Sequence, residues 1–192
     1  MKLTTITPDP SALRALAHPV RLRILGLLRS EGSATATTLA QRLGLNSGAT
    51  SYHLRQLHQH GFIEDDTTRG NARDRWWHAA HQSTRTDPTV DASLEGREAV
   101  DAFGQAIAVV HTESLQRSIE EAPTLPEAWR RATMLSDWNL RLTAKHAEQL
   151  VRALDELVSG WEEDDDLPGT EELVVQLHTY PRPGTVAPEE FA

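Results

Sequence analysis

The chain contains no cysteine and no long apolar run, and both absences narrow what it can be. Without cysteine it has no disulfide and no thiolate metal site, which is typical of proteins in a reducing compartment. No apolar stretch approaches the roughly 18 residues that a membrane-spanning helix needs, and residues 1–5 lack the apolar centre of a secretory signal. We therefore expect a soluble, cytoplasmic protein with no membrane partner.

The motifs of common enzymes are also missing. The sequence has no G-x-S-x-G nucleophile turn, no phosphate-binding P-loop, no glycine-rich dinucleotide turn and no cysteine nucleophile. Carboxylates are plentiful, but most of them stand in runs, which is typical of solvated surface. We predict no catalytic residues and no cofactor. An enzyme acting on a small molecule in the C-terminal half stays open as an alternative that no motif supports.

The net charge of −9 is unevenly distributed along the chain. Residues 1–80 carry ten lysines and arginines against six acids, a balance of +4, whereas residues 81–192 carry nine against twenty-two, a balance of −13. A polyanion such as DNA would be attracted to the first part and repelled by the second. We expect the acidic part to face away from any nucleic acid, or merely to keep the protein soluble.

Residues 35–61 predict two helices joined by a tight turn. Gly44 can end the first helix in a left-handed conformation, and Asn46 can cap the second through its side-chain oxygen. When residues 46–60 are projected on a helix, three residues fall on one side, which we expect to be buried. Its members are Thr50, Leu54 and Leu57.

The other side of this second helix is polar and contains no carboxylate. It mixes hydroxyl, amide, aromatic and guanidinium groups, which can donate and accept hydrogen bonds at base edges and phosphates. Its members are Gly48, Ser51, Tyr52, Arg55, Gln56 and Gln59. We therefore expect this face to contact double-stranded DNA.

Three motifs follow one another between Leu13 and Ala80: LRALAHPVRLRILGLL, TTLAQRLGL and SGATSYHLRQLHQHGFIE. In their order and spacing they resemble the winged helix-turn-helix of the ArsR-like transcriptional regulators, and most nearly the actinobacterial branch with a long extra C-terminal region. The resemblance implies that the N-terminal part of the second helix enters the major groove. It does not extend to the C-terminal half.

The resemblance also identifies residues 62–79 as the wing, with strands expected at 62–64 and 75–79 around a segment rich in turn formers. Arginines on a wing commonly reach the DNA backbone or the minor groove. His53 lies beside the buried side of the reading helix, so it packs or contacts a phosphate more readily than it acts as a titrating switch. The predicted DNA contacts are Ser47, Gly48, Ser51, Tyr52, His53, Arg55, Gln56, Arg69, Arg73 and Arg75.

The chain before this motif predicts two further helices. One follows Asp9-Pro10 and ends near Ala17, and the next begins at Pro19 and ends at Glu31-Gly32. Three arginines lie off the apolar stripe of the second of these helices, and they are either phosphate contacts or solvated charges. They are Arg21, Arg23 and Arg29.

Beyond the wing, residues 81–93 read as a linker and residues 94–121 as a long helix. In the related regulators the helix after the wing forms the dimer interface, so the resemblance implies a homodimer. The long helix carries an apolar stripe that is longer than we expect one small domain to need: Val100, Phe103, Ile107, Val110, Ser114 and Leu115.

The rest of the chain predicts strand, helix and strand. Apolar residues alternate at 138–142 and again at 173–177, as in strands, and between them Thr143 can cap an amphipathic helix. We therefore expect a small α/β unit, followed by a frayed tail. The expected domains are a winged helix-turn-helix at 1–80, the linker at 81–93, a dimerisation and effector region at 94–180 and the tail at 181–192.

Many ArsR-like proteins release DNA when a metal binds, and nine histidines raise that question here. The resemblance places such sites at cysteine pairs, or at Asp and His residues of the dimer helix. Cysteine is absent, and the dimer helix offers Asp101, His111 and Glu113 without a repeat that converges on one ion. We predict no metal site, although His146 and His178 could meet in the folded chain.

A small-molecule effector stays open as a partner. The hint is a set of aromatic residues that either fill a core or line a pocket: Phe103, Trp129, Trp138 and Trp161.

The sequence thus predicts a fold that is mainly α with small β structure (α+β): a winged helix-turn-helix domain, a long dimerisation helix and a small C-terminal α/β unit. We expect a sequence-specific DNA-binding transcriptional regulator, a homodimeric repressor of ArsR-like type. Two alternatives remain: a ligand- or metal-responsive regulator whose C-terminal unit is the sensor, and a winged-helix module that binds a protein instead of DNA.

Overall fold

The computed structural model describes residues 4–69, 75–86, 93–164 and 167–187. They belong to two compact units, which divide at Leu135. The first unit contains the predicted DNA-binding region together with the long helix. This boundary between units differs from the domain limits expected from the sequence. Those limits stay a prediction.

Four helices open the first unit, and each begins at a residue whose side chain accepts a hydrogen bond from the helix backbone. Such caps satisfy N–H groups that have no partner within the helix. The capping residues are Asp9, His18, Thr35 and Asn46. The helices are α1 (Pro10–Leu16), α2 (Pro19–Ser30), α3 (Ala36–Leu43) and α4 (Ser47–Gln59).

The turn between α3 and α4 has the expected geometry. Gly44 adopts a left-handed conformation with φ of 64° and ends α3. Asn46 then starts α4, because its Oδ1 accepts a hydrogen bond from the Ala49 N–H at 2.8 Å. The four predicted helices of residues 10–59 are therefore confirmed.

A small antiparallel sheet completes the winged fold. Its strand order is β2-β4-β3, where β2 is Ala34–Thr35, β3 is Ile63–Asp65 and β4 is Trp76–Ala79. Glu64 lies opposite His78 in the pairing of β3 with β4. Both predicted wing strands are therefore present, while the tip at 70–74, with Arg73, lies outside the described residues. The predicted α+β fold class is confirmed.

The predicted linker is partly ordered as a strand. Within it β5 (Ser83–Thr84) pairs in parallel with β1 (Thr5–Ile6). This pairing joins the start of the chain to the segment that follows the wing.

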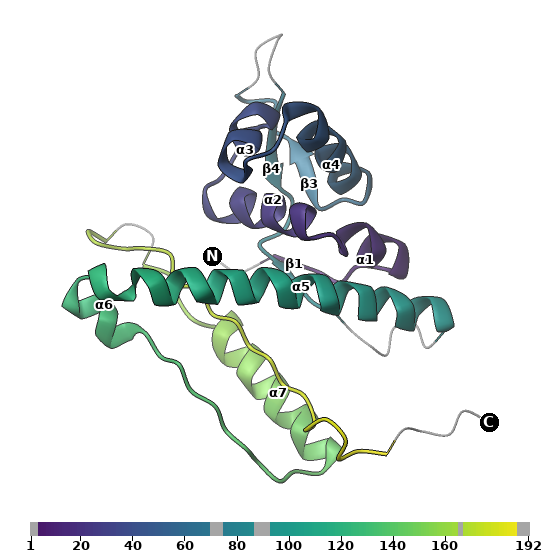
Figure 1. Cartoon of the computed structure of the whole chain (residues 1–192), viewed down its shortest axis with the longest axis vertical. Helices are drawn as coiled ribbons and strands as arrows, with labels where there is room; N and C mark the ends of the chain where they lie inside the picture. The colour runs from purple at the N-terminus through teal and green to yellow at the C-terminus, as the bar shows by residue number, and fades with distance from the viewer. Residues whose placement is uncertain (1–3, 70–74, 87–92, 165–166, 188–192) are drawn as a thin grey trace. The chain divides into compact units, whose positions relative to one another are not determined.

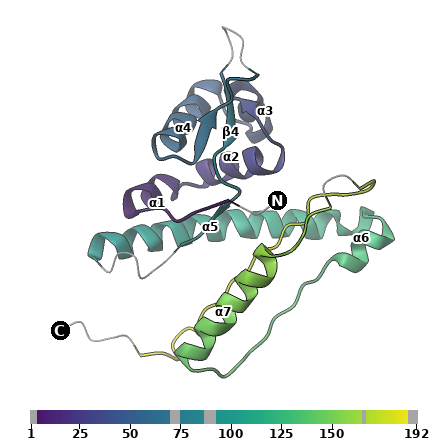
Figure 2. The same cartoon turned by 180° about the vertical axis from the view of Figure 1, so that it is seen from behind.

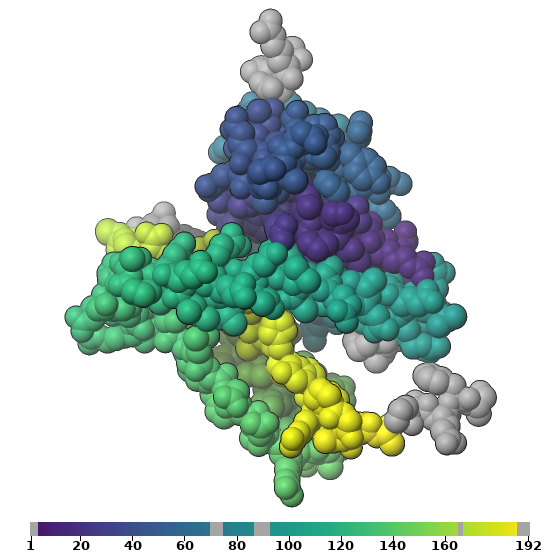
Figure 3. Space-filling view, viewed as in Figure 1, coloured from purple at the N-terminus to yellow at the C-terminus, as the bar shows by residue number. Residues whose placement is uncertain are grey.

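The long helix α5 (Leu94–Glu121) runs along α1 and α2, as Figure 1 and the reverse view in Figure 2 both show. Ala99 and Ala106 of α5 are buried. Their side chains are small, so they allow the helices to approach closely. The space-filling view in Figure 3 shows the close fit along this line. The helix ends in a short 3₁₀ turn (Ala122–Thr124), and α6 (Glu127–Ala132) follows.

The apolar stripe of α5 needs a correction. The resemblance to ArsR-like regulators implied that this helix faces a second copy, and the length of the stripe favoured the same interpretation. Phe103, Ile107 and Val110 pack instead against the core of the same chain. That core draws on α1, α2, α3, α4, β3 and β4, with these side chains fully buried: Leu16, Ile24, Leu25, Leu39, Leu54, Leu57, Phe62 and Ile63.

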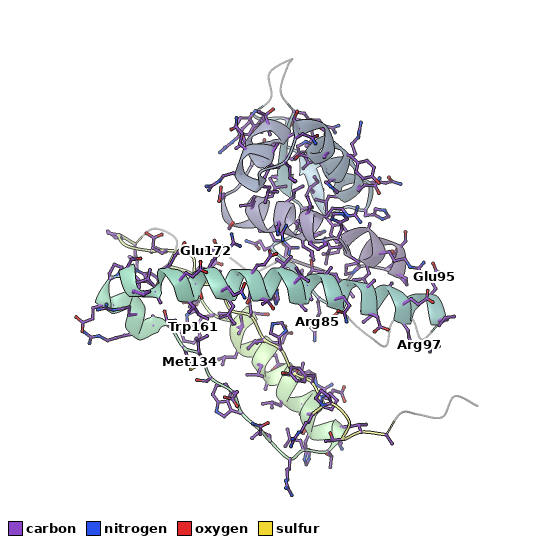
Figure 4. The ribbon with its side chains drawn as sticks, in the orientation of Figure 1. Arg85, Glu95, Arg97, Met134, Trp161 and Glu172 are labelled. Atoms are coloured by element: carbon purple, nitrogen blue, oxygen red, sulfur yellow. The ribbon has the colours of Figure 1, made fainter. Side chains whose placement is uncertain are left out.

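Ion pairs reinforce the contact of α5 with the helices above it. Arg14 of α1 donates to Glu95, which Figure 4 marks in the first turn of α5. Arg23 of α2 makes a two-pronged contact with Glu113, with Nε donating to Oε2 at 3.0 Å and Nη2 to Oε1 at 2.5 Å. The planar guanidinium matches a carboxylate in this way, which fixes geometry as well as adding energy.

The second unit contains α7 (Ala144–Ser159), capped by Thr143 as predicted. An extended segment that includes Leu177 and Thr179 lies along this helix (Figures 1 and 2). The predicted strands at 138–142 and 173–177 are wrong, because no backbone pairing joins them among the described residues. Alternating apolar residues fit an extended backbone, but a strand also needs a neighbour for its N–H and C=O groups. The expected α/β unit is therefore one helix with extended flanks.

The aromatic residues of the second unit form neither a core nor an enclosed pocket. Trp138 is 71% exposed and Trp161, labelled in Figure 4, is 75% exposed. The expectation of core packing is wrong for these two tryptophans. As for membranes, none of the described helices is both long and apolar enough to cross a bilayer.

The Arg23–Glu113 contact should contribute measurably to the docking of α5. We expect Arg23→Met and Glu113→Gln each to lower the free energy of unfolding, with a coupling energy of about 0.5–1 kcal/mol in a double-mutant cycle, since both side chains are partly exposed. Chemical denaturation in low and high salt measures it. Additive effects of the two substitutions would show that the pair does not hold the helix.

Candidate nucleic-acid interface

The rotation of α4 about its axis is fixed by its buried side. Thr50, Leu54 and Leu57 are all buried, and the Thr50 hydroxyl donates to the Asn46 carbonyl at 3.1 Å. This confirms the predicted inward set. The opposite side of the helix must consequently face away from the core.

Most of the predicted reading residues of α4 lie on this outward side, whereas His53 lies at its border with the buried side, and their exposure differs. Ser47, Gly48 and Arg55 are exposed, and Tyr52 is 51% exposed. Three others are half-buried: Ser51, His53 and Gln56. The helix contains no carboxylate over Ser47–Gln59, so the face is free of groups that would repel a phosphate.

Gly48 has no evident internal reason to be glycine. A Cβ built on it would meet only the Asn46 Oδ1, at 3.4 Å, which is ordinary contact. Its backbone is helical, so the positive φ that favours glycine is not required there. The structure therefore leaves room for a larger side chain at this position.

The wing arginines are more constrained than the sequence indicated. The Arg75 Nε lies 2.6 Å from the Asp65 Oδ2, and its guanidinium lies 4.1 Å from the centre of the Trp77 ring. The Arg69 Nε lies 3.7 Å from the Asp66 carboxylate. Both predicted DNA contacts thus already have a counter-ion at the base of the wing, and a phosphate would have to compete for them.

Asp66 organises the start of the wing, a role that the sequence analysis missed. The Ser33 hydroxyl donates to its Oδ2 at 2.6 Å, and the Thr68 N–H donates to its Oδ1 at 3.1 Å. The Ser33 hydroxyl, followed by the Thr68 hydroxyl, lowers the pKa of Asp66. An Asp followed two residues later by Thr is a local turn pattern and was visible in the sequence; its bond to Ser33 was not.

Two of the three arginines on α2 are neither phosphate contacts nor solvated charges. Arg23 pairs with Glu113, as described above. Arg29 donates from Nε to the His81 carbonyl at 2.8 Å and from Nη2 to the Thr84 hydroxyl at 2.8 Å. Burial lowers the pKa of Arg29 to about 10. This side chain ties the segment after the wing to α2.

A pair of histidines joins the start of α2 to the reading helix. The His18 Nδ1 accepts a hydrogen bond from the Val20 N–H at 3.2 Å. Its ring lies 4.7 Å from that of His53, which in turn lies 5.5 Å from the Tyr52 ring. Of the two roles expected for His53, packing or a phosphate contact, the structure shows packing against His18, a partner that the sequence analysis did not name. Its contact with DNA stays a prediction.

Both histidines favour their neutral forms. Burial, followed by the nearby charge of Arg21, lowers the pKa of His18. Burial lowers the pKa of His53 as well, with further effects of His18 and Arg21. The His53 Nδ1 is buried and has no hydrogen-bond partner within the described part of the chain.

Away from α4, the structure has two small surface hollows. A hollow of about 300 Å³ lies between α2 and α5 and is lined by polar side chains that include Arg23 and Arg117. Another, of about 150 Å³, lies against α7 and is lined in part by Leu154 and Leu177. Among the residues that the structure describes, no group of three or more His, Asp or Glu side chains could hold a metal ion.

Comparison with known families agrees with this geometry. Residues 16–66 match a family model described as a helix-turn-helix domain. This part of the chain is therefore similar to a helix-turn-helix domain. Its α3 and α4, with the left-handed turn at Gly44 between them, are the two helices of that motif.

Individual proteins resemble parts of the chain. The HTH-type transcriptional regulator YgaV of Escherichia coli (strain K12) is 38% identical over 52 residues, which are 27% of this chain and 52% of that protein. The chain therefore spans about half the length of this curated relative.

Among solved structures, reduced HlyU from Vibrio cholerae N16961 has a TM-score of 0.32 at 23% identity, over 50% of this chain and 83% of that one. The transcriptional regulator Tm0710 from Thermotoga maritima has a TM-score of 0.30 at 12% identity, over 74% of each chain. At such scores neither likeness bears on function.

The histidine pair should make stability depend on pH. A pKa that is lower in the folded than in the unfolded protein means that protonation favours unfolding. The stability that His18 and His53 contribute should be complete above their ordinary pKa of 6.5 and should be lost as the pH falls from there through the lowered values. Thermal unfolding between pH 7.5 and 5 measures the loss.

The double variant His18→Asn, His53→Gln should lose less stability over this range than the unchanged protein, since Asn can still cap α2. Gln59→Asn, at an exposed position of the same helix, changes no titratable group, so it is the control and should leave the pH profile unchanged. Equal profiles for all three proteins would show that the pair has no part in the acid sensitivity.

Proposed function

We propose that this protein is a sequence-specific DNA-binding transcriptional regulator, acting in the cytoplasm as a homodimeric repressor of ArsR-like type. The observation that carries the proposal is the outward face of α4. That face is polar and free of carboxylate, and a fully buried side holds it in a fixed rotation. A helix of this kind, second in a helix-turn-helix, suits the major groove.

The N-terminal turn of α4 would enter the groove first. Ser47 and Gly48 are exposed there, and a residue without a side chain lets the backbone approach the DNA. Tyr52, Arg55 and Gln56 follow along the same side and would contact base edges or the flanking backbone. The wing, through Arg69, Arg73 and Arg75, would contribute positioning contacts once its internal ion pairs rearrange.

A second copy would dock on the far side of α5. Leu115 and Ile119 lie about 180° around the helix from the buried Ala99 and Ala106, and they are 41% and 50% exposed. Apolar side chains on an outer helix face are suited to burial in a dimer. Two reading helices would then bind half-sites about one helical turn of DNA apart.

Selection of bound DNA tests the proposal directly. The purified protein is incubated with sheared genomic DNA at about 100 mM salt, and the retained fragments are sequenced. We expect enrichment of a pseudo-palindrome whose half-sites lie about 10 base pairs apart. Failure to retain duplex DNA at low salt would contradict the proposal and favour the alternative of a protein-binding winged helix.

Arg55 should discriminate between sequences. Arg55→Ala should weaken binding to the selected site by about 1–3 kcal/mol if its guanidinium contacts a base in a bidentate manner. Binding of the same variant to random duplex should fall much less, as measured by fluorescence anisotropy on both DNAs. An equal loss on the two DNAs would assign Arg55 to the phosphate backbone.

Replacing Gly48 should raise the stability of α4 and lower the affinity for DNA. Gly48→Ala should stabilise α4 by up to about 1 kcal/mol, because alanine is the better helix former and the structure has room for its methyl group. The same methyl group should weaken binding to the selected DNA by hindering close approach. Gly26→Ala, also in a helix and with open space around its Cβ, is the control and should leave DNA affinity unchanged.

A further inference from the structure

Arg21 stands out among the arginines of the first unit. It lies on the first turn of α2 beside the histidine pair, and it is half-buried. Its Nε is buried without a hydrogen-bond partner. Among the residues that the structure describes, no carboxylate forms an ion pair with it.

The other arginines of this unit show how unusual that is. Three of them form ion pairs with carboxylates: Arg14 with Glu95, Arg42 with Glu31 and Arg75 with Asp65. Arg23 and Arg29 are held by α5 and by the segment after the wing. Within the described parts of residues 4–86, Arg21 and Arg55 alone have neither a hydrogen bond nor an ion pair. Arg55 is exposed to solvent, whereas Arg21 is half-buried.

A partly buried cation without a counter-ion is unfavourable, since it loses hydration and gains no partner. Burial accordingly lowers the pKa of Arg21. Its neighbours bring no negative charge to this place, because the adjacent His18 and His53 are neutral or positive. The site is therefore complementary to an anion that comes from outside the protein.

The position of Arg21 indicates which anion. Arg21 lies near Tyr52, the exposed aromatic residue of the proposed reading face, because Tyr52 is close enough to affect the pKa of Arg21. It belongs to α2, which packs beside α4, and so it is not part of the outward face of α4 itself. Groups at the flank of a helix seated in the major groove meet the sugar-phosphate backbone.

We propose that Arg21 binds a phosphate of the DNA backbone beside Tyr52, and thereby positions α4 in the groove. The inference rests on the proposed function and names a contact that it did not include. With Nε buried, the terminal nitrogens of the guanidinium are the donors to the phosphate oxygens. The ion pair forms only in the complex, where the phosphate supplies the charge that the free protein lacks.

The test compares Arg21→Met with Arg42→Met in the full chain. Arg42 is an exposed arginine on α3 that already pairs with Glu31, so it serves as a matched loss of one positive charge. Affinity is measured by fluorescence anisotropy on the selected DNA and on random duplex, over a range of salt concentrations. Thermal unfolding of each free protein is recorded in parallel.

We expect Arg21→Met to lower affinity about 5- to 50-fold on both DNAs and to reduce the slope of log affinity against log salt by about 1. Arg21→Lys should restore part of the affinity. The free Arg21→Met protein should unfold at the same temperature as the unchanged protein or higher, because an unpaired buried charge has been removed. Arg42→Met should leave affinity near that of the unchanged protein.

Distinct outcomes would overturn the inference. Unchanged affinity and salt slope in Arg21→Met, while the unchanged protein binds DNA, would remove the phosphate contact and leave the proposed function intact. Loss of affinity together with a lower unfolding temperature would assign Arg21 a structural role. If inorganic phosphate raises the unfolding temperature only when Arg21 is present, yet DNA affinity does not depend on Arg21, the site takes free phosphate. Absence of DNA binding by the unchanged protein would instead refute the proposed function itself.

Discussion

The burial of Thr50, Leu54 and Leu57 is the constraint on which the proposed interface depends. These three side chains lie along one side of α4 and are buried in the common core. Any rotation of the helix about its axis would expose them and lose their apolar contacts. The same constraint decides which residues point outward. A reading face is useful only if its side chains return to the same place each time, and the core provides that rigidity.

The helices of the first unit were predictable because their signals are local. Apolar spacing shows which side is buried, and Asp9, Asn46 and Gly44 mark where helices begin and end. The long helix α5 was predicted with the same limits that the structure has. Strands carry a weaker local signal. The alternation at 138–142 and at 173–177 was real, but nothing in the sequence shows whether a second strand lies within hydrogen-bonding distance.

The interface was predictable in its residues and less so in its electrostatics. The side of α4 that faces outward follows from spacing, so Ser47, Tyr52 and Arg55 could be chosen from the sequence alone. The residues that pair with the arginines could not be predicted from the sequence. Arg23 pairs with Glu113, which lies 90 residues further along the chain, on α5. Arg29 donates to the carbonyl of His81, 52 residues further along. Such pairs depend on the fold as a whole, and no periodicity or motif reports them.

This pairing is consistent with the proposal that an acidic chain carries a surface for DNA. Formal charge counts every arginine equally, whereas an arginine held by a carboxylate contributes little to the field outside the protein. Near α4 that field is set by Arg21 and Arg55, which lack such partners among the described residues, and by the absence of carboxylates on the helix itself. Charges further than about 10 Å away are largely screened at 0.1 M salt. The acids of the C-terminal half would therefore weaken the proposed DNA binding only where they approach this face, and the overall charge of −9 is a poor guide to it.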